Sequence, residues 1–150
     1  MDSAIKDRRD SVYIEAQYHP LYKELTDGAE APFEYMKDVF MTALLLGYRL
    51  GKPKPLEKRH MIFKISAFNP SVDLPILRAV ALGPSGDISA LTSENRTLTL
   101  AEEYANAGFA ALRAEVLDRP GLTVNNLILL LQRLSEGEPS ASEVATTADS

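Results

Sequence analysis

The feature that most constrains this fold is one long apolar stripe between Pro32 and Gly51. Its residues recur at spacings of three and four, which is the periodicity of a helix face packed on a core. The stripe consists of Phe33, Met36, Phe40, Ala43, Gly47 and Leu50, and it is widened by Val39 and residues 44–46. Gly51 suits a left-handed helix cap, and two prolines within the next four residues prevent continuation. We therefore predict a central helix over residues 32–51.

Shorter helical patterns lie on both sides of this stripe. A helix is expected to begin at Pro20, which suits a first helical position, and to end at the next glycine. Another is expected to run from a cap at Ser71 or Asp73 to Leu82. One short turn of helix fits residues 85–92. The first half of the chain and its middle are therefore expected to be mainly helical.

The second half of the chain carries two further helical segments. Thr99 and Glu102 match a capping box, in which a hydroxyl and a carboxylate each satisfy a free amide at a helix start. The helix that they open is expected to end near residue 117, and Gly108 inside it predicts a close contact with another helix. Thr123 is expected to cap the last helix. Its inward-facing residues are predicted to be Leu127, Leu130, Leu131 and Leu134.

One segment, residues 60–66, has the alternation of a strand, at Met61, Phe63 and Ile65. Since one strand cannot form a sheet, it is either an added edge or a partner of residues 12–14, which fit a short strand or a helical lead-in. We predict an all-α fold, a compact bundle of five or six helices. This prediction allows one short strand or hairpin near residues 60–66.

The chain has 150 residues, the usual size of one domain. We expect a polar N-terminal arm over residues 1–11 and a single helical domain over residues 12–134. Residues 135–150 are rich in Ser, Ala, Thr and Glu, with no long apolar side chain beyond Val144. Such a segment buries too little surface to offset the entropy of ordering, which predicts a disordered acidic tail.

The composition argues against most catalytic chemistry. The chain has no cysteine, and its two histidines lie 41 positions apart, at His19 and His60. It also lacks the glycine-rich motifs that bind nucleotide phosphates. Glu102 and Glu103 are adjacent, so on a helix they point about 100° apart and do not form a carboxylate pair. We therefore predict a protein that is not an enzyme and that holds no metal or cofactor.

Signals for export or membrane insertion are lacking in the sequence given. The first ten residues are charged and have no apolar core, unlike a signal peptide. The longest apolar runs are too short to cross a bilayer. The expected location is the cytoplasm, with no membrane partner.

The net charge of −5 conceals one basic segment. Residues 49–64 hold six bases and one acid, giving +5, between a segment 1–48 of −4 and a segment 65–150 of −6. Three interpretations are open, in decreasing weight: solvated cations at a helix end and loop, a contact with an acidic partner protein, and a contact with DNA phosphates. The candidate contact residues are Arg49, Lys52, Lys54, Lys58, Arg59 and His60.

Several runs of this sequence resemble a small bacterial family. The most specific is Lys37-Asp38-Val39-Phe40-Met41, within residues 32–41. The other runs are residues 46–52, 55–59, 73–75, 79–82, 86–87 and 102–108. Together they cover about residues 19–117. The family that they resemble is known by gene neighbourhood, as the fourth protein associated with dnd (DNA phosphorothioation) systems.

The resemblance implies a place in an antiviral defence system that marks host DNA by replacing a backbone oxygen with sulfur and restricts unmarked DNA. It supplies no catalytic residues. Lys37, Asp38 and Asn106 are matching positions that core packing explains poorly, so Lys37 and Asp38 are expected to form a salt bridge or touch a partner. We hypothesise a non-catalytic accessory protein that binds other proteins of the same gene cluster. The alternative is a DNA-binding accessory or regulator that uses residues 49–64.

Overall fold

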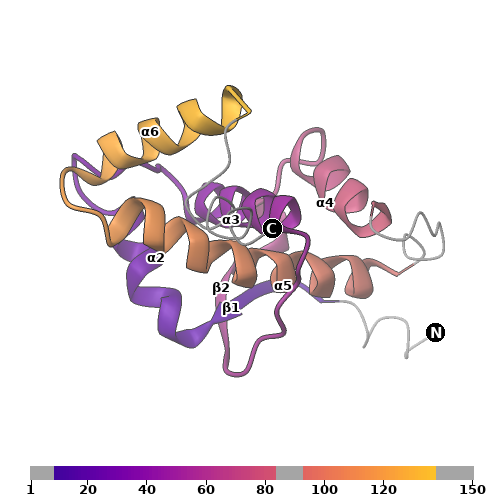
Figure 1. The fold of residues 1–150 in the computed structure, drawn as a ribbon. Coiled ribbons are helices and arrows are strands. Elements are labelled where there is room, and N and C mark those ends of the chain that lie inside the picture. Colours follow the sequence, from indigo (N-terminus) through magenta and orange to yellow (C-terminus); the bar gives the residue numbers. More distant parts are fainter. Residues whose placement is uncertain (1–8, 84–92, 138–150) are drawn as a thin grey trace.

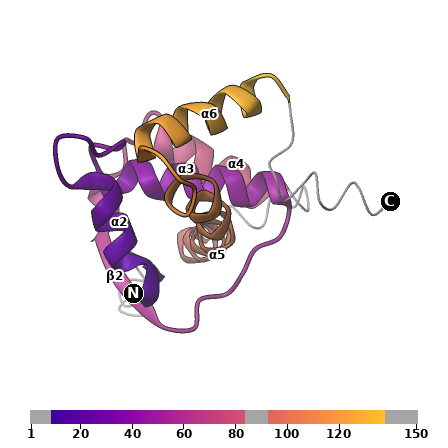
Figure 2. The same ribbon diagram turned by 60° about the vertical axis from the view of Figure 1, so that its left-hand side comes forward.

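Two long helices meet at the centre of the molecule in this computed structural model, which describes residues 9–83 and 93–137 (Figure 1). They are α3 (Met36–Leu50) and α5 (Glu94–Leu112). In Figure 2, α3 runs across the view while α5 is seen nearly end-on, so the two helices cross steeply. A Cβ atom on Gly47 or Gly108 would overlap the backbone of the opposite helix. The predicted close contact at Gly108 is therefore confirmed, because glycine alone permits this approach.

The other elements surround this helix pair. They are β1 (Ser11–Glu15), α2 (His19–Thr26), β2 (Arg59–Lys64), α4 (Asp73–Leu82) and α6 (Thr123–Ser135), with short turns η1 (Ala16–Tyr18), η2 (Ile65–Ala67) and the π-helical η4 (Arg113–Leu117). In Figure 1, α6 and α4 both lie above α5, α6 toward its C-terminal end and α4 toward its N-terminal end. Across the two described ranges the structure has five α-helices and one small sheet, which confirms the predicted mainly α fold.

The sheet is a single antiparallel pair of β1 and β2. Of the two alternatives for the strand near residues 60–66, pairing with residues 12–14 is the one observed. A bulge interrupts the register, because Val12 pairs with Phe63 while its neighbour Tyr13 pairs with Met61. The extra residue, Ile62, reverses the alternation of faces. Met61 is consequently 46% exposed, and the expectation that it shares a face with Phe63 is wrong.

The central helix begins four residues later than expected. Residue 33 is held against the preceding helix, since the Phe33 N–H donates to the carbonyl oxygen of Leu25 (3.1 Å). Tyr35 is extended and precedes the first turn of α3 at Met36. The predicted end is confirmed: Gly51 caps the helix in the left-handed conformation, with φ of 77°.

The predicted capping box at Thr99 and Glu102 is wrong, because α5 begins at Glu94. Its N-cap is Ser93, whose hydroxyl accepts from the Arg96 N–H (3.2 Å). The first turn is polar and lacks a helical apolar pattern, so periodicity gave no sign of it. Glu102 lies in the middle of α5, where the backbone N–H groups are paired within the helix and need no cap. Its side chain contacts β1 and the chain segment before that strand.

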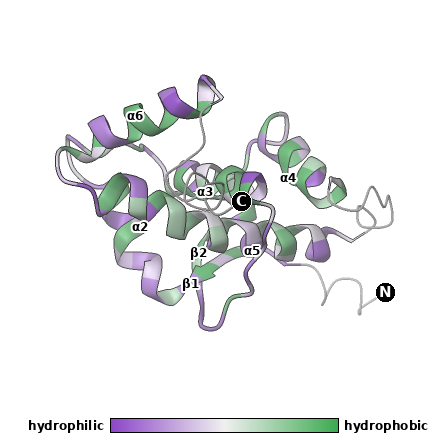
Figure 3. Cartoon of the chain, in the orientation of Figure 1, coloured by the Kyte–Doolittle hydropathy of each residue, from purple (hydrophilic) through white to green (hydrophobic). Residues whose placement is uncertain are grey.

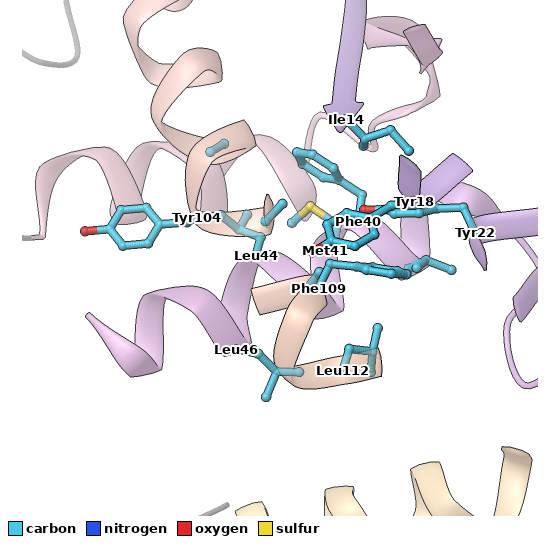
Figure 4. Packing of buried hydrophobic residues seen from close by; sticks show 14 of the residues in the cluster. Ile14, Tyr18, Tyr22, Phe40, Met41, Leu44, Leu46, Tyr104, Phe109 and Leu112 are labelled. Atoms are coloured by element: carbon cyan, nitrogen blue, oxygen red, sulfur yellow. The ribbon is translucent and has the colours of Figure 1, made fainter. Parts of the chain in front are cut away.

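The buried apolar residues form one cluster that takes side chains from β1, α2, α3, α4, α5 and α6. Figure 4 shows the aromatic part, in which the rings of Tyr18 and Tyr22 pack on Phe109 at centroid distances of 4.6 and 4.8 Å. Leu127 and Leu130 of α6 are buried as predicted. Leu131 was expected inside but is 48% exposed, because it lies about 100° further round the helix than Leu130.

Parts of three predicted segments lie outside the described residues, namely the arm before residue 9, the turn at 85–92 and the tail from residue 138. At the end of the arm, Ser11 already belongs to β1. Within residues 9–83 and 93–137, no helix is long and apolar enough to cross a membrane.

Candidate functional site

The basic segment contains an exposed loop whose backbone is held at several points. This loop, residues 51–58, connects α3 to β2, and we call it the basic loop (Figure 1). In its middle, the Lys54 N–H donates to the carbonyl oxygen of Glu103 (2.9 Å), and the Asn106 amide donates to the carbonyl oxygens of Lys54 (3.1 Å) and Pro55 (3.3 Å). The main chain of the loop is therefore fastened to α5.

Glu15 fastens the other end of the basic loop. Its two carboxylate oxygens accept from the N–H groups of Glu57 and Lys58, each at 2.8 Å. The Ala16 N–H then donates to the carbonyl oxygen of Lys58 (2.8 Å). The Glu15 side chain is buried, and both of its carboxylate oxygens accept hydrogen bonds from these amides. It therefore stabilises the loop without pairing with any lysine in the described residues.

The cations of the segment differ in their surroundings. Lys52, Lys54 and Lys58 are exposed, and within the described part of the chain their ammonium groups make no ion pair or hydrogen bond. Arg59 is half exposed and contacts the Glu102 carboxylate at 3.5 Å, and Lys64 contacts Asp10 at 3.3 Å. Among the described residues, no acidic group neutralises these three of the predicted contact residues, so their charges can interact with a partner. Arg49 lies, exposed, on the last turn of α3, ahead of the basic loop.

The two histidines are far apart in the sequence, but their rings pack against each other at a tilt. The rings of His19 and His60 lie 4.2 Å apart between centroids. Partial burial lowers the pKa of His19, and the nearby charges of His60 and Lys23 lower that pKa further. This pairing was missed at the sequence level, because a helix start and a strand meet only after β1 and β2 pair. It brings His19 next to His60, which lies two residues beyond the end of the basic loop.

A buried carboxylate joins the N-terminal residues to the end of this loop. Glu102 accepts from the Arg9 guanidinium and from the Tyr13 N–H (2.7 Å), and it also contacts Arg59. Both guanidinium groups lie over the Tyr13 ring, at 5.4 Å for Arg9 and 4.7 Å for Arg59. Burial raises the pKa of Glu102, and the contacts with Arg9, Tyr13 and Arg59 oppose that rise. Sequence reasoning missed this site, because it assigned Glu102 to a helix cap.

The positions that the family resemblance singled out have structural contacts. Lys37 pairs with Asp73 at the start of α4 (3.0 Å), and this hydrogen bond raises the pKa of Lys37. Lys37 also lies 4.0 Å from Asp38, so of the two expectations for this pair the salt bridge is observed. Asp73 accepts from the Asn69 N–H as well (2.7 Å). Asn106, as described above, holds the basic loop.

A second open surface lies on α6. Val124, Ile128 and Leu131 recur at the spacing of one helix face, which lies beside the buried face of α6; Val124 is half-buried and the other two are exposed. Ile128 is 47% exposed and Leu131 48%, while Leu129 and Leu122 beside them are also exposed. Figure 3 shows the apolar middle of α6 at the edge of the molecule. We call this surface the α6 face. Sequence reasoning assigned Leu131 to the core and so missed it.

Acidic side chains buried in the described residues are all engaged in structural contacts. Besides Glu15, Glu102 and Asp73, Glu115 pairs with Arg133 and Arg119. Across residues 9–83 and 93–137, no group of three or more His, Asp or Glu side chains is placed to hold a metal ion. The chemistry that the open surfaces can offer is therefore cationic contact at the basic loop and apolar contact at the α6 face.

These features define a small helical protein that presents two open surfaces, one basic and one apolar. The chain belongs to the DNA sulphur modification system-associated protein 4 family, whose model matches residues 12–149. The match confirms the resemblance found in the sequence and extends it at both ends. Comparison with curated proteins and with solved structures gave no significant match.

Proposed function

We propose that this protein is a non-catalytic accessory component of a DNA sulphur modification system, and that it acts by binding another protein of the same system. Membership of the family supports the association with such a system. The α6 face is the observation that carries the mode of action. On this proposal the protein works in the cytoplasm, where the DNA that such a system modifies is found. It takes part in antiviral defence together with the rest of the system.

The α6 face has the chemistry of a protein-binding surface. Its exposed side chains are apolar or uncharged, and the single cation of α6, Arg133, is turned to Glu115. Apolar residues at helical spacing on an outer face are typical of helices that pack on a partner. An exposed apolar stripe costs solubility unless a partner covers it. A contact with another protein accounts for this stripe.

The assignment of a non-catalytic role rests on how the buried carboxylates are used. A general acid or base needs a proton-transfer group within reach of a substrate. Glu15, Asp73, Glu102 and Glu115 instead fix a loop, a helix start, the N-terminal residues and α6, respectively. Each of these groups has an evident structural task that explains why it is buried.

The proposal is tested by co-expressing the tagged chain with the other proteins of its system and identifying what co-purifies. The wild type is expected to retain one of them, and Ile128→Glu with Leu131→Glu is expected to lose it, because two charges then have to be buried at the contact. Both positions are about half exposed, so the folded state should tolerate the changes. Unchanged circular dichroism and thermal unfolding would verify this.

A matched control places the same two charges on other exposed apolar positions. Tyr35→Glu with Val72→Glu does so at residues that are 59% and 55% exposed, outside α6. This control is expected to keep the partner. The proposal is contradicted if no protein of the system is retained, if both double variants behave alike, or if the wild type only associates with a second copy of itself in light-scattering measurements.

A further inference from the structure

We propose that the basic loop binds the phosphate backbone of duplex DNA, with Lys52, Lys54 and Lys58 as the contact residues and without reading base sequence. The inference goes beyond the proposed function, because it concerns a different surface and a different class of partner. The basic loop lies between α3 and β2, and the α6 face belongs to another element. Each surface can therefore be altered while the other is left intact.

These lysines differ from several other cations of the chain, which form ion pairs. Lys37, Arg59 and Lys64 pair with acidic groups of the chain, as Arg133 does with Glu115. The side chains of Lys52, Lys54 and Lys58 are exposed and make no such pair in the described residues. Three like charges within seven residues repel one another, and a bound polyanion relieves that repulsion.

The backbone that carries these charges is held by hydrogen bonds to α5 and β1. Asn106, Glu103 and Glu15 hold the loop through the hydrogen bonds described above, at both its middle and its end. Binding to such a loop has to order side chains only, which lowers its entropic cost. A loop that served only to connect α3 and β2 would not need its positive side chains gathered on a held backbone.

The residue types of the basic loop distinguish DNA from an acidic protein as its partner. Interfaces between proteins are depleted in lysine and enriched in aromatic residues, methionine and arginine. Residues 51–58 offer three lysines and two exposed prolines, with no aromatic residue, methionine or arginine. Phosphate contacts are made readily by lysine as a point charge, and such contacts position a protein without reading the sequence. The loop composition therefore favours phosphate.

The test is fluorescence anisotropy of a labelled DNA duplex of about 20 base pairs, titrated with the full chain at several salt concentrations. With three phosphate contacts, the association constant of the wild type is expected to fall about 40-fold between about 50 and about 200 mM NaCl. Lys52→Gln, Lys54→Gln and Lys58→Gln together are expected to weaken binding at low salt at least about tenfold and to flatten the salt slope by about 1 per lysine.

The control removes the same charge elsewhere. Arg78→Gln, Arg96→Gln and Arg113→Gln together change the net charge equally, at exposed positions outside the basic loop. This control is expected to keep most of the affinity. The inference is overturned by no binding at low salt, by equal losses in both triple variants, or by preferential binding of labelled polyglutamate over the duplex. The α6 double variant should bind DNA as the wild type does, which separates this outcome from that of the proposed function.

Discussion

Glu102 connects three parts of the chain through one buried carboxylate. It receives the Tyr13 N–H of β1, the Arg9 guanidinium before β1 and the Arg59 guanidinium of β2. A buried carboxylate is costly unless such donors surround it. Here burial dominates and raises the pKa of Glu102, while the three donors oppose the rise. The residue thus links the sheet to α5, although burying its carboxylate disfavours the charged form.

This balance predicts a specific pH dependence for Glu102→Gln. Between the ordinary pKa of a glutamate and the raised pKa, the folded state binds the proton more tightly than the unfolded state. The free energy of unfolding of the wild type therefore falls, relative to that of the variant, as the pH rises through this range. Each tenfold difference in proton affinity corresponds to about 1.4 kcal/mol.

Urea unfolding of both proteins between about pH 4 and pH 7 measures this difference. Arg9→Gln serves as a comparison, because it leaves the titrating carboxylate in place and removes one opposing donor. A wild type that gains stability over Glu102→Gln as the pH rises would show that the guanidinium contacts outweigh burial, which contradicts our interpretation.

At the scale of elements, the crossing of α3 and α5 depends on two glycines. The backbones touch where Gly47 of α3 meets Gly108 of α5, and a side-chain carbon at either position would overlap the opposite main chain. Because α5 also holds the basic loop through Asn106, this contact sets where the loop lies relative to the sheet. The helix crossing therefore determines the geometry of the basic surface.

Gly108→Ala is expected to destabilise the protein by about 1–3 kcal/mol or more, because α3 and α5 must separate to admit a methyl group. Helix propensity alone predicts the opposite sign, a gain of up to about 1 kcal/mol. Urea unfolding distinguishes the two. Ala110→Gly, at an exposed position of the same helix, calibrates the propensity effect. An unchanged or increased stability of Gly108→Ala would contradict the close contact.

The sequence predicted those elements that have strong local signals. The helix over α3 was found from its apolar stripe, its end from Gly51, and the helix contact from Gly108. The start of α5 was missed, since its first turn is polar and its cap at Ser93 lacks the capping-box partner. The contact between the rings of His19 and His60 was also missed, because it depends on the pairing of distant strands, which local periodicity does not contain.

The candidate surfaces show the same division. Residues 49–64 stood out by charge, but only the structure separates paired cations such as Arg59 from the lysines of the basic loop, which have no acidic partner within residues 9–83 and 93–137. Leu131 had the spacing of a core residue, yet it is exposed. The apolar residues of α6 cover a wider part of the helix surface than the part that packs on the core. Charge and periodicity indicate which residues are available, and the packing of elements decides which of them are exposed.

At the scale of the whole molecule, charge and apolar surface are placed on different elements. The basic loop joins α3 to β2 and is held by α5 and β1, whereas the α6 face lies at the edge of the molecule (Figure 3). On our two proposals, a protein at the α6 face and DNA at the basic loop would be bound at the same time. The proposed bridging role fits the association of this family with a DNA sulphur modification system.

The most direct test of the account is hydrogen–deuterium exchange of the chain, measured alone and in complex with its co-purifying partner. We expect slower exchange over residues 123–135 on partner binding, while residues 51–58 exchange as in the free chain when DNA is absent. Unchanged exchange in α6, with protection appearing at the basic loop instead, would contradict the central claim that α6 is the partner-binding surface.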